Sequence, residues 1–371
     1  MTAVVCSVSC RNHNKQELKQ TPWGAIGDTT ALDGTFDLAE IQTNGELIAL
    51  TLNGPDTYYE YKGKFLGKQY LMAQRFADRV GVGLRVEVCR DTAEMLQRLE
   101  AGEADLICYP MSNRGIGWKV GKGKKNLRKE LAAWYTPNIL EDVKREEDFL
   151  LSAQSVKRKV FAPMLNAKNG VISHYDALFQ RYAQPIRWDW RLMAAQCYQE
   201  STFDPQAKSW AGACGLMQIM PSTADHLGLE RSVIFDPEQN IAAASRYINE
   251  LSQTFSDIGN RNERTKFVLA AYNGGHFHIR DAMALAKKYG KNPQRWADVD
   301  AYVLKLSQPE FYNDPVVKHG YMRGSETSDY VSKIMDRWNG YRGIRTVHSS
   351  AAMAGVPQRA THARKKKYQA F

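Results

Sequence analysis

The segment from Ala194 to Thr223, AAQCYQESTFDPQAKSWAGACGLMQIMPST, constrains this 371-residue chain more than any other. Apolar residues recur at helical spacing ahead of Glu200, and Pro205 stops a helix from continuing beyond it. Small residues at 212–215 allow the next segment to pack closely against that helix. A carboxyl group at such a buried helix end is disfavoured in its charged form, so Glu200 is expected to hold a proton and donate it. Cleavage of a glycosidic bond requires such an acid beside the leaving oxygen.

Several motifs in this half of the chain occur together and in one order. They are ISHYD (172–176), WDWRLMAAQ (188–196), ES (200–201), GLMQIMPSTA (215–224) and AAYNGG (270–275). Over about residues 172–342, this set resembles the family 1 lytic transglycosylases, and in particular their membrane-bound F-type branch. The resemblance implies a mainly α-helical, lysozyme-like domain that cleaves peptidoglycan between N-acetylmuramic acid and N-acetylglucosamine.

The resemblance also implies roles for single residues. Glu200 would act first as the acid and then as the base of a cleavage that closes a 1,6-anhydro ring without consuming water. Ser201 would orient Glu200 or the acetamido group of the substrate. No cofactor and no metal are implied. The remaining implied substrate-binding residues line the glycan cleft: Gly215, Met217, Gln218, Tyr272, Asn273 and Tyr330.

Only one strong carboxylate candidate is found, whereas an ordinary glycosidase places two beside the bond. In a transglycosylase the six-position hydroxyl of the same sugar attacks, so a high effective molarity replaces the second carboxylate. A hydrolytic muramidase of the same fold would need Asp204 or Asp225, the nearest acids in sequence. A third interpretation is a non-catalytic wall-binding or scaffold protein, against which the intact Glu200, Gln218 and Tyr272 argue. A fourth is a solute sensor driven by the N-terminal half, which the expected lack of a second lobe there weakens.

The chain carries a formal charge of +10, which allows nucleic acid, an anionic surface or an acidic polymer as a partner. No zinc-finger or RNA-recognition signature accompanies the charge, so nucleic acid is not expected. Peptidoglycan peptides carry free carboxylates and suit a basic surface, and simple solubility explains the charge equally well. The sequence contains no run of about 18 apolar residues, so no membrane-spanning helix is expected.

Metal-ligating residues lack the spacing of a known site. None of the six cysteines forms a CxxC pair, which argues against zinc. His276 and His278 resemble two ligands of a metal site, but no third ligand follows. Cys197 and Cys214 lie in segments that meet in a lysozyme-like fold, and either a disulfide or two free buried thiols is consistent with that placement.

The N-terminal half alternates strand and helix patterns, which predicts parallel βαβ units. Strands are expected at GELIALTLN from Gly45, at 84–89 and at 104–110, with helices at 65–80 and 92–101. These phrases resemble the first lobe of a periplasmic solute-binding protein, a module that F-type transglycosylases carry. The second lobe is expected to be absent or reduced to a loop at 113–125, and the charge run 141–148 to be a solvated helix face. The fold class is therefore α+β with two domains.

The C-terminal half predicts a set of helices. Asp236 is expected as an N-cap with Gln239 closing a capping box, before a helix whose core stripe includes Ile248. A helix at 267–272 should break at Asn273-Gly274-Gly275, and 324–338 should form the final helix.

The ends of the chain complete the predicted organisation. The expected parts are a leader and extended tether (1–39), the solute-binding-like lobe (40–150), a linker (151–170), the lysozyme-like domain (171–345) and a basic disordered tail (346–371). Ser9-Cys10 resembles the end of a lipoprotein signal, which makes Cys10 the expected lipid acceptor; a plain disordered terminus is the alternative. The expected location is the periplasm, with attachment to the outer membrane as a lipoprotein. Cell-wall proteins are candidate partners of the N-terminal lobe.

Overall fold

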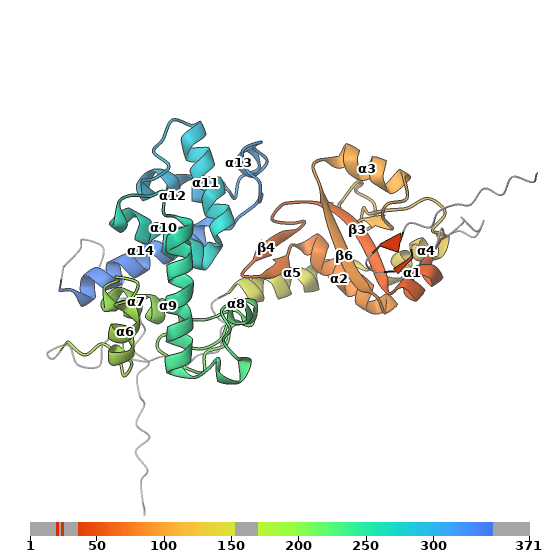
Figure 1. Cartoon of the computed structure of the whole chain (residues 1–371). Coiled ribbons are helices and arrows are strands. Elements are labelled where there is room, and N and C mark those ends of the chain that lie inside the picture. The colour runs from red at the N-terminus through yellow and green to blue at the C-terminus, as the bar shows by residue number, and fades with distance from the viewer. Residues whose placement is uncertain (1–19, 22–23, 26–35, 153–169, 344–371) are drawn as a thin grey trace, which may run out of the picture.

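The computed structural model describes residues 20–21, 24–25, 36–152 and 170–343. Figure 1 shows an α/β module formed by the N-terminal half and a helical domain formed by the C-terminal half. The predictions for Cys10, for most of the tether, for the linker and for the basic tail lie outside the described residues, although short strands β1 (Gln20–Thr21) and β2 (Gly24–Ala25) pair within the predicted tether. Among the helices of the described residues, none has the length and apolar character needed to cross a membrane.

The α/β module is built on a four-stranded sheet with the order β6-β3-β7-β8. Strand β3 (Glu46–Leu52) is parallel to β6 (Gly83–Cys89) and to β7 (Leu106–Ile107), which confirms the predicted parallel units. Strand β8 (Lys119–Val120) returns antiparallel beside β7, and only residues 108–118 connect the two.

Successive side chains of β3 point to opposite faces of the sheet, and helices cover both faces. Leu47 and Ala49 pack with α1, α2 and α4, whereas Leu50 packs with α3 on the opposite face. Asp37 caps both α1 and α4 with its buried carboxylate, so the predicted boundary between residues 39 and 40 falls inside α1. The helices of the module are α1 (Leu38–Asn44), α2 (Lys68–Val80), α3 (Thr92–Glu100), α4 (Lys125–Trp134) and α5 (Pro137–Leu151).

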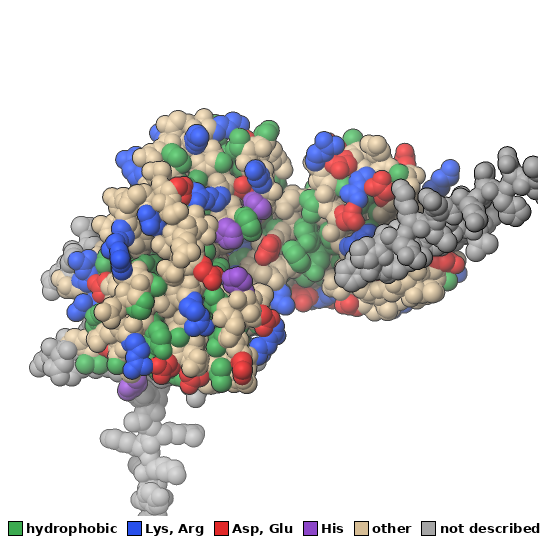
Figure 2. All heavy atoms as spheres, in the orientation of Figure 1, with side chains coloured by type: hydrophobic (Ala, Val, Ile, Leu, Met, Phe, Trp, Pro, Cys, Tyr) green, Lys and Arg blue, Asp and Glu red, His purple; other side chains and the backbone are tan. Residues whose placement is uncertain are grey.

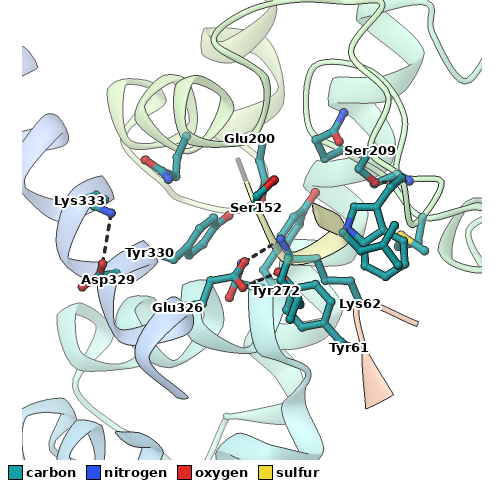
Figure 3. Close-up of a pocket in the computed structure, with 18 residues that line it drawn as sticks. Tyr61, Lys62, Ser152, Glu200, Ser209, Tyr272, Glu326, Asp329, Tyr330 and Lys333 are labelled. Carbon is teal, nitrogen blue, oxygen red and sulfur yellow. Dashed lines mark hydrogen bonds and ion pairs between the residues drawn. The ribbon is translucent and has the colours of Figure 1, made fainter. Parts of the chain in front are cut away.

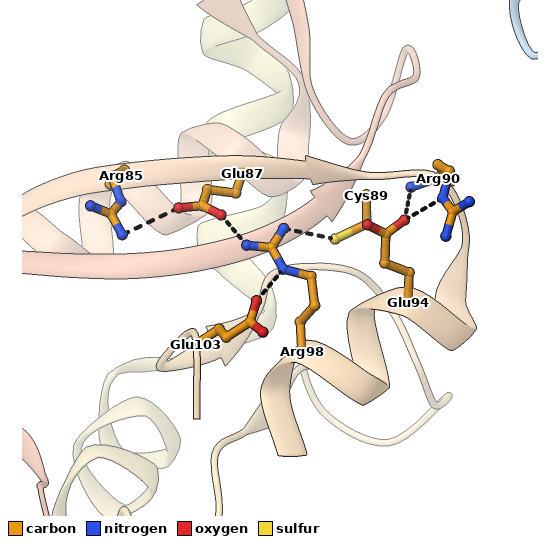
Figure 4. Close-up of polar contacts among 7 residues, drawn as sticks. All are labelled: Arg85, Glu87, Cys89, Arg90, Glu94, Arg98 and Glu103. Atoms are coloured by element: carbon orange, nitrogen blue, oxygen red, sulfur yellow. Dashed lines mark hydrogen bonds and ion pairs between the residues drawn. The ribbon is translucent and has the colours of Figure 1, made fainter. Parts of the chain in front are cut away.

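A network of charged side chains joins α3 to the edge strand β6 (Figure 4). Arg98 donates to Glu103 at 2.7 Å, to Glu87 of β6 and, at 3.8 Å, to the sulfur of Cys89. The pairs lie at the surface, where such contacts contribute little to stability. The network therefore orients α3 on the sheet edge and is remote from the residues discussed below.

A β-hairpin replaces the start of the helix predicted from Phe65. Strands β4 (Tyr59–Tyr61) and β5 (Lys64–Leu66) pair antiparallel through a two-residue turn. Both turn residues, Lys62 and Gly63, have positive φ, as the tight hairpin turn requires. Helix α2 begins only after this hairpin, so the helix predicted at 65–80 is confirmed from Lys68 to Val80 and starts three residues later than predicted.

Helix α5 fixes the base of the hairpin. Glu147 is only 7% exposed and accepts hydrogen bonds from the Tyr59 hydroxyl at 3.1 Å and the Gly67 N–H at 3.0 Å. Burial raises the pKa of Glu147, although these two donors oppose the rise. The prediction that the charge run 141–148 is a solvated helix face is therefore wrong at this position.

The helical domain surrounds α7, which packs against α6 and α14. The N-cap Asp236 accepts from the N–H of Gln239, and the stripe that includes Ile248 is buried, as predicted. Helix α10 ends at the predicted break, where Gly275 has φ +83°. The elements are α6 (Asp176–Ala183), α7 (Trp190–Ser201), α8 (Pro221–His226), η2 (Arg231–Val233), α9 (Pro237–Thr254), α10 (Arg261–Gly274), α11 (His276–Lys288), α12 (Trp296–Lys305), α13 (Pro309–Tyr312) and α14 (Gly324–Tyr341).

Candidate active site

A cavity of about 320 Å³ opens at the C-terminal end of α7. Its walls come from α7, α10, α14, the segment before α8, the end of α5 and the turn of the β4–β5 hairpin (Figure 3). Both modules therefore contribute side chains to one cavity. The lining residues used below are Tyr61, Lys62, Glu200, Ser209, Trp210, Gln218, Tyr272, Asn273, Glu326, Asp329 and Tyr330.

Glu200 lies half-buried in the last turn of α7 and faces this cavity. The hydroxyl of Tyr330, on α14, donates a hydrogen bond to Glu200 Oε1 at 2.5 Å. Tyr330 is only 4% exposed, and its oxygen accepts from Nε2 of the fully buried Gln196 at 3.2 Å. Burial and the charge of Glu200 hold the pKa of Tyr330 well above its usual value, so the phenol remains a donor. The packing of α7 on α14 thus fixes the orientation of the Glu200 carboxyl group.

The segment that carries Gln218 is folded around the buried Asn240 of α9. The Asn240 side chain accepts from the Met217 N–H at 2.8 Å and donates to the carbonyls of Cys214 and Ile234. Only glycine fits at Gly215, because φ is +78° and a Cβ atom would lie 2.5 Å from Asn240 Nδ2. A buried amide with all these partners fixes the segment beside the cavity.

Gln218 reaches the cavity through a left-handed backbone conformation with φ +48°. Its Nε2 donates to the carbonyls of Ala207 at 3.1 Å and Gly215 at 2.9 Å, so the amide orientation is fixed before any ligand binds. Ser209, four residues before Ala213 and accepting from its N–H, lines the same wall. Sequence reasoning did not select Ser209.

Tyr272 and Asn273, both in the AAYNGG motif, line the cavity from the end of α10. The Tyr272 hydroxyl donates to the Met217 carbonyl at 2.8 Å, and Asn273 Oδ1 accepts from Thr327 at 2.8 Å. Burial and the charge of Glu200 raise the pKa of Tyr272 well above its usual value. These bonds tie α10 to the Gln218 segment on one side and to α14 on the other.

Three residues predicted to bind substrate do not line the cavity. Ser201 is fully buried, and its hydroxyl donates to the Leu216 carbonyl at 2.8 Å. Met217 is also fully buried, and Gly215 lies in the turn behind the wall. None of the three is among the residues that line the cavity, so their roles in substrate binding stay predictions. Ser201 instead joins the end of α7 to the segment that carries Gln218.

Cys197 and Cys214 are free thiols, so the predicted alternative of a disulfide is wrong. The Cys197 sulfur lies 3.4 Å from the Leu216 carbonyl, whereas the Cys214 sulfur lies 3.1 Å from the Gly212 carbonyl. The two side chains therefore point at different backbone groups. In the part of the chain that the structure describes, no group of three His, Cys, Asp or Glu residues is arranged to hold a metal ion.

The hairpin contributes two residues that sequence reasoning missed. Lys62 Nζ forms an ion pair with Glu326 Oε1 at 2.7 Å, and the Tyr61 hydroxyl donates to the other oxygen of Glu326 (Figure 3). The Tyr61 ring stacks on Trp210 with centroids 6.1 Å apart and an interplanar angle of 8°. Burial opposes the charge of Lys62, but Glu326, Tyr61 and Glu200 outweigh it and raise its pKa. Lys62 thus brings a positive charge into the electrostatic environment of Glu200.

Glu326 corrects the prediction of a single carboxylate. It precedes Tyr330 by one helical turn on α14, and that four-residue spacing was a usable signal in the sequence. Burial opposes its ionisation, but Lys62 and Tyr61 hold the pKa of Glu326 below its usual value. Asp329 also lines the cavity and pairs with Lys333 at 3.2 Å. Neither Asp204, which is 6% exposed, nor Asp225, which pairs with Arg231, lines the cavity.

Comparisons with known proteins give a matching domain family and a relative similar over most of the chain. Residues 177–294 match the family model described as Transglycosylase SLT domain. Membrane-bound lytic murein transglycosylase F of Enterobacter sp. (strain 638) is 28% identical over 415 residues, which covers 80% of this chain and 79% of that protein.

Two solved structures are similar to parts of the chain. The 70 kDa soluble lytic transglycosylase of Escherichia coli is 25% identical with a TM-score of 0.32, and the match covers 47% of this chain and 26% of that one. A mutant of domain 1 of TmArgBP in its arginine-bound form is 18% identical with a TM-score of 0.24, over 29% of this chain and 98% of that one. Residues 177–294 therefore match the Transglycosylase SLT domain, and most of the chain is similar to a membrane-bound lytic murein transglycosylase F.

Proposed function

We propose that this protein is a peptidoglycan lytic transglycosylase in which Glu200 acts as the acid and then as the base. The bond cleaved is the β-1,4 linkage between N-acetylmuramic acid and N-acetylglucosamine, and the product ends in a 1,6-anhydro muramic acid. The observation that carries the proposal is the Glu200 carboxyl group, held by Tyr330 in a cavity that Gln218, Tyr272 and Asn273 complete.

The reaction starts with a protonated Glu200. Its proton passes to the glycosidic oxygen as the bond to the muramic anomeric carbon breaks, and the acetamido group of the same sugar assists. The Glu200 carboxylate formed in this step is stabilised by the Tyr330 hydroxyl and by the positive charge of Lys62. It then removes the proton from the six-position hydroxyl, which attacks the anomeric carbon and closes the ring.

The other cavity residues bind and orient the glycan. The Gln218 amide and the Asn273 side chain are fixed by bonds to the protein, so they present their remaining polar capacity to the sugar without reorganisation. Tyr272 forms part of the cavity wall. Ser209 provides a hydroxyl on the same side of the cavity as Gln218.

A hydrolytic muramidase is the second candidate, because Glu326 gives the cavity another carboxylate. Hydrolysis would require a carboxylate that is available to activate water or to attack the sugar. Glu326 is instead engaged by Lys62 and Tyr61. The ion pair therefore favours the transglycosylase.

Digestion of purified peptidoglycan tests the proposal. The wild-type chain should release muropeptides that are lighter by one water than the products of hydrolysis. Glu200→Gln should abolish cleavage and leave the thermal unfolding unchanged, whereas the control Asp225→Asn, an exposed acid outside the cavity, should cleave normally. Cleavage by the Glu200→Gln chain would refute the role of Glu200, and products that carry the extra water would establish hydrolysis.

We also propose that the protein works in the cell envelope, since the relative is named a membrane-bound enzyme. The finer proposal is a periplasmic lipoprotein attached to the outer membrane through Cys10, with peptidoglycan strands as the partner and no nucleic acid. Cell-wall proteins that dock on the N-terminal module remain part of this proposal. Mass spectrometry of the mature N-terminus in the native host is the test, and an unmodified Cys10 would exclude lipid anchoring there.

A further inference from the structure

A second cavity of about 450 Å³ lies next to the first, where the two modules meet. The two cavities share five lining residues, so they are adjacent parts of one groove: Lys62, Gln218, Met220, Tyr272 and Asn273. Figure 2 shows hydrophobic side chains and histidines gathered at the hollow between the two modules. The predicted role of Glu200 makes no use of this second cavity.

Exposed aromatic rings form two walls of the second cavity. On the N-terminal module, Phe65 is 45% exposed and stacks on Tyr58 with centroids 4.9 Å apart. On the helical domain, Phe277 is 54% exposed and stacks on His319 with centroids 4.6 Å apart. Large apolar rings that stay exposed along a groove commonly mark a binding site. Each wall thus offers a flat ring, backed by a second ring.

The two walls are held in a fixed relation by contacts between the modules. The Lys62–Glu326 ion pair and the Tyr61–Trp210 stack anchor the hairpin that carries Phe65. The N–H of Tyr321 donates to the Asn53 side chain at 2.6 Å and joins the two modules a second time. The cavity is therefore formed before any ligand binds.

The chemistry of the lining fits a sugar polymer. Side-chain amides of Asn53, Gln218 and Asn273 also line the cavity, and of the described residues that line it only Glu60 and Lys62 carry a full charge at neutral pH. Burial, together with a neighbouring histidine, lowers the pKa of His278 to about 4, so that ring is neutral at physiological pH. The C–H faces of a pyranose pack on flat rings, and its hydroxyl and acetamido groups pair with amides.

We propose that this cavity is a second saccharide-binding site, built jointly by the two modules, which holds the β-1,4 glycan strand beyond the sugars at Glu200. The inference rests on the proposed function, because the occupant is the strand that enters the catalytic cavity. It assigns to the N-terminal module a part in substrate binding, through the hairpin that carries Lys62 and Phe65. A strand long enough to fill both cavities binds more tightly than a disaccharide, which fills one.

The test measures binding by calorimetry to the full chain carrying Glu200→Gln, which prevents cleavage. The probes are a disaccharide and an octasaccharide of peptide-free peptidoglycan glycan. Phe65→Ala and Phe277→Ala are each expected to weaken octasaccharide binding about tenfold, or ~1.4 kcal/mol, and to leave disaccharide binding unchanged. Phe65→Trp and Phe277→Trp, which keep a flat ring, should retain octasaccharide affinity.

Phe149→Ala and Tyr289→Ala are matched controls, since both rings are exposed, at 52% and 47%, and line neither cavity. Equal octasaccharide affinity in the groove variants and these controls would overturn the inference, as would an equal loss for both probes. In either case the wild-type chain would still cleave peptidoglycan, so the proposed function would stand. A wild-type chain that leaves peptidoglycan uncut would instead refute the proposed function.

Discussion

Replacing Tyr330 with Phe removes one hydroxyl group and tests how the fold supports Glu200. The ring of Tyr330 is 4% exposed and packed on α14, so Phe should occupy the same space. The change deletes the 2.5 Å bond to Glu200 Oε1 and leaves Gln196 Nε2 without the acceptor it has at 3.2 Å. Activity and stability should therefore both fall, for separate reasons.

The size of each effect follows from these two bonds. A hydrogen bond to a charged group contributes about 1.5–3 kcal/mol, which corresponds to a loss of about 10- to 150-fold in kcat/KM if the bond is made mainly to the carboxylate formed during the reaction. Leaving the buried Gln196 donor unpaired costs about 1–3 kcal/mol of unfolding free energy. Since Tyr330 does not bind the leaving sugar in this mechanism, KM should change less than kcat.

The pH dependence of kcat/KM distinguishes a role of Tyr330 in the reaction from a purely structural role, which would leave it unchanged. A donor on Oε1 favours the charged carboxylate over the protonated acid. Without the Tyr330 hydroxyl, Glu200 should keep its proton to higher pH, and the decline in kcat/KM on the alkaline side should move upward. The assay is the release of soluble muropeptides from peptidoglycan at a series of pH values.

Tyr302→Phe is the control, because Tyr302 is a buried tyrosine of the same domain, 5% exposed, and does not line the cavity. Both variants should be compared by urea unfolding. If Tyr330→Phe shows the same kcat/KM and the same pH profile as Tyr302→Phe, the hydrogen bond to Glu200 has no part in the reaction and the reasoning fails.

Three further predictions concern the supports of the site. Burial and a neighbouring histidine lower the pKa of His278 to about 4 in the folded chain. The unfolded chain binds a proton at this histidine already below about pH 6.5, so the folded state is fully stable above that pH and loses stability as the pH falls toward 4. The free energy of unfolding, measured in urea, should therefore fall less between about pH 7 and 4.5 in His278→Gln than in the wild-type chain, by about 2–3 kcal/mol. An equal fall in both chains would contradict this. Asn240→Leu removes three buried hydrogen bonds and leaves the Met217 N–H without its side-chain acceptor, so it should cost roughly 3 kcal/mol of unfolding free energy; a much smaller loss would show that the Gln218 segment does not depend on Asn240. Glu326→Gln removes the charge that pairs with Lys62 and should speed amide hydrogen exchange in the hairpin residues 59–66, whereas unchanged exchange would show that the ion pair does not hold the hairpin.

The sequence alone located the most local features of the site. Glu200 follows an apolar helical run, Tyr272 and Asn273 precede two glycines that end a helix, and Tyr330 lies on a helix at the end of the domain. Such features depend on residues a few positions apart, because helix periodicity, helix caps and glycine breaks are all determined by residues that are close in the sequence. The parallel strands of the N-terminal module were predictable for the same reason.

The tertiary structure decided which of these residues share a cavity and which side chains stay behind its wall. Ser201 sits beside Glu200 in sequence, but a helix turns successive side chains by about 100°, so it points into the core. Lys62 lies 138 positions before Glu200 in the sequence, but its charge interacts with Glu200 in the structure. The reason is that the hairpin of one module is fixed on α14 of the other by the Lys62–Glu326 ion pair. No local sequence pattern encodes a contact between surfaces that meet only after both modules have folded. The groove wall that the hairpin forms could therefore be found only from the structure.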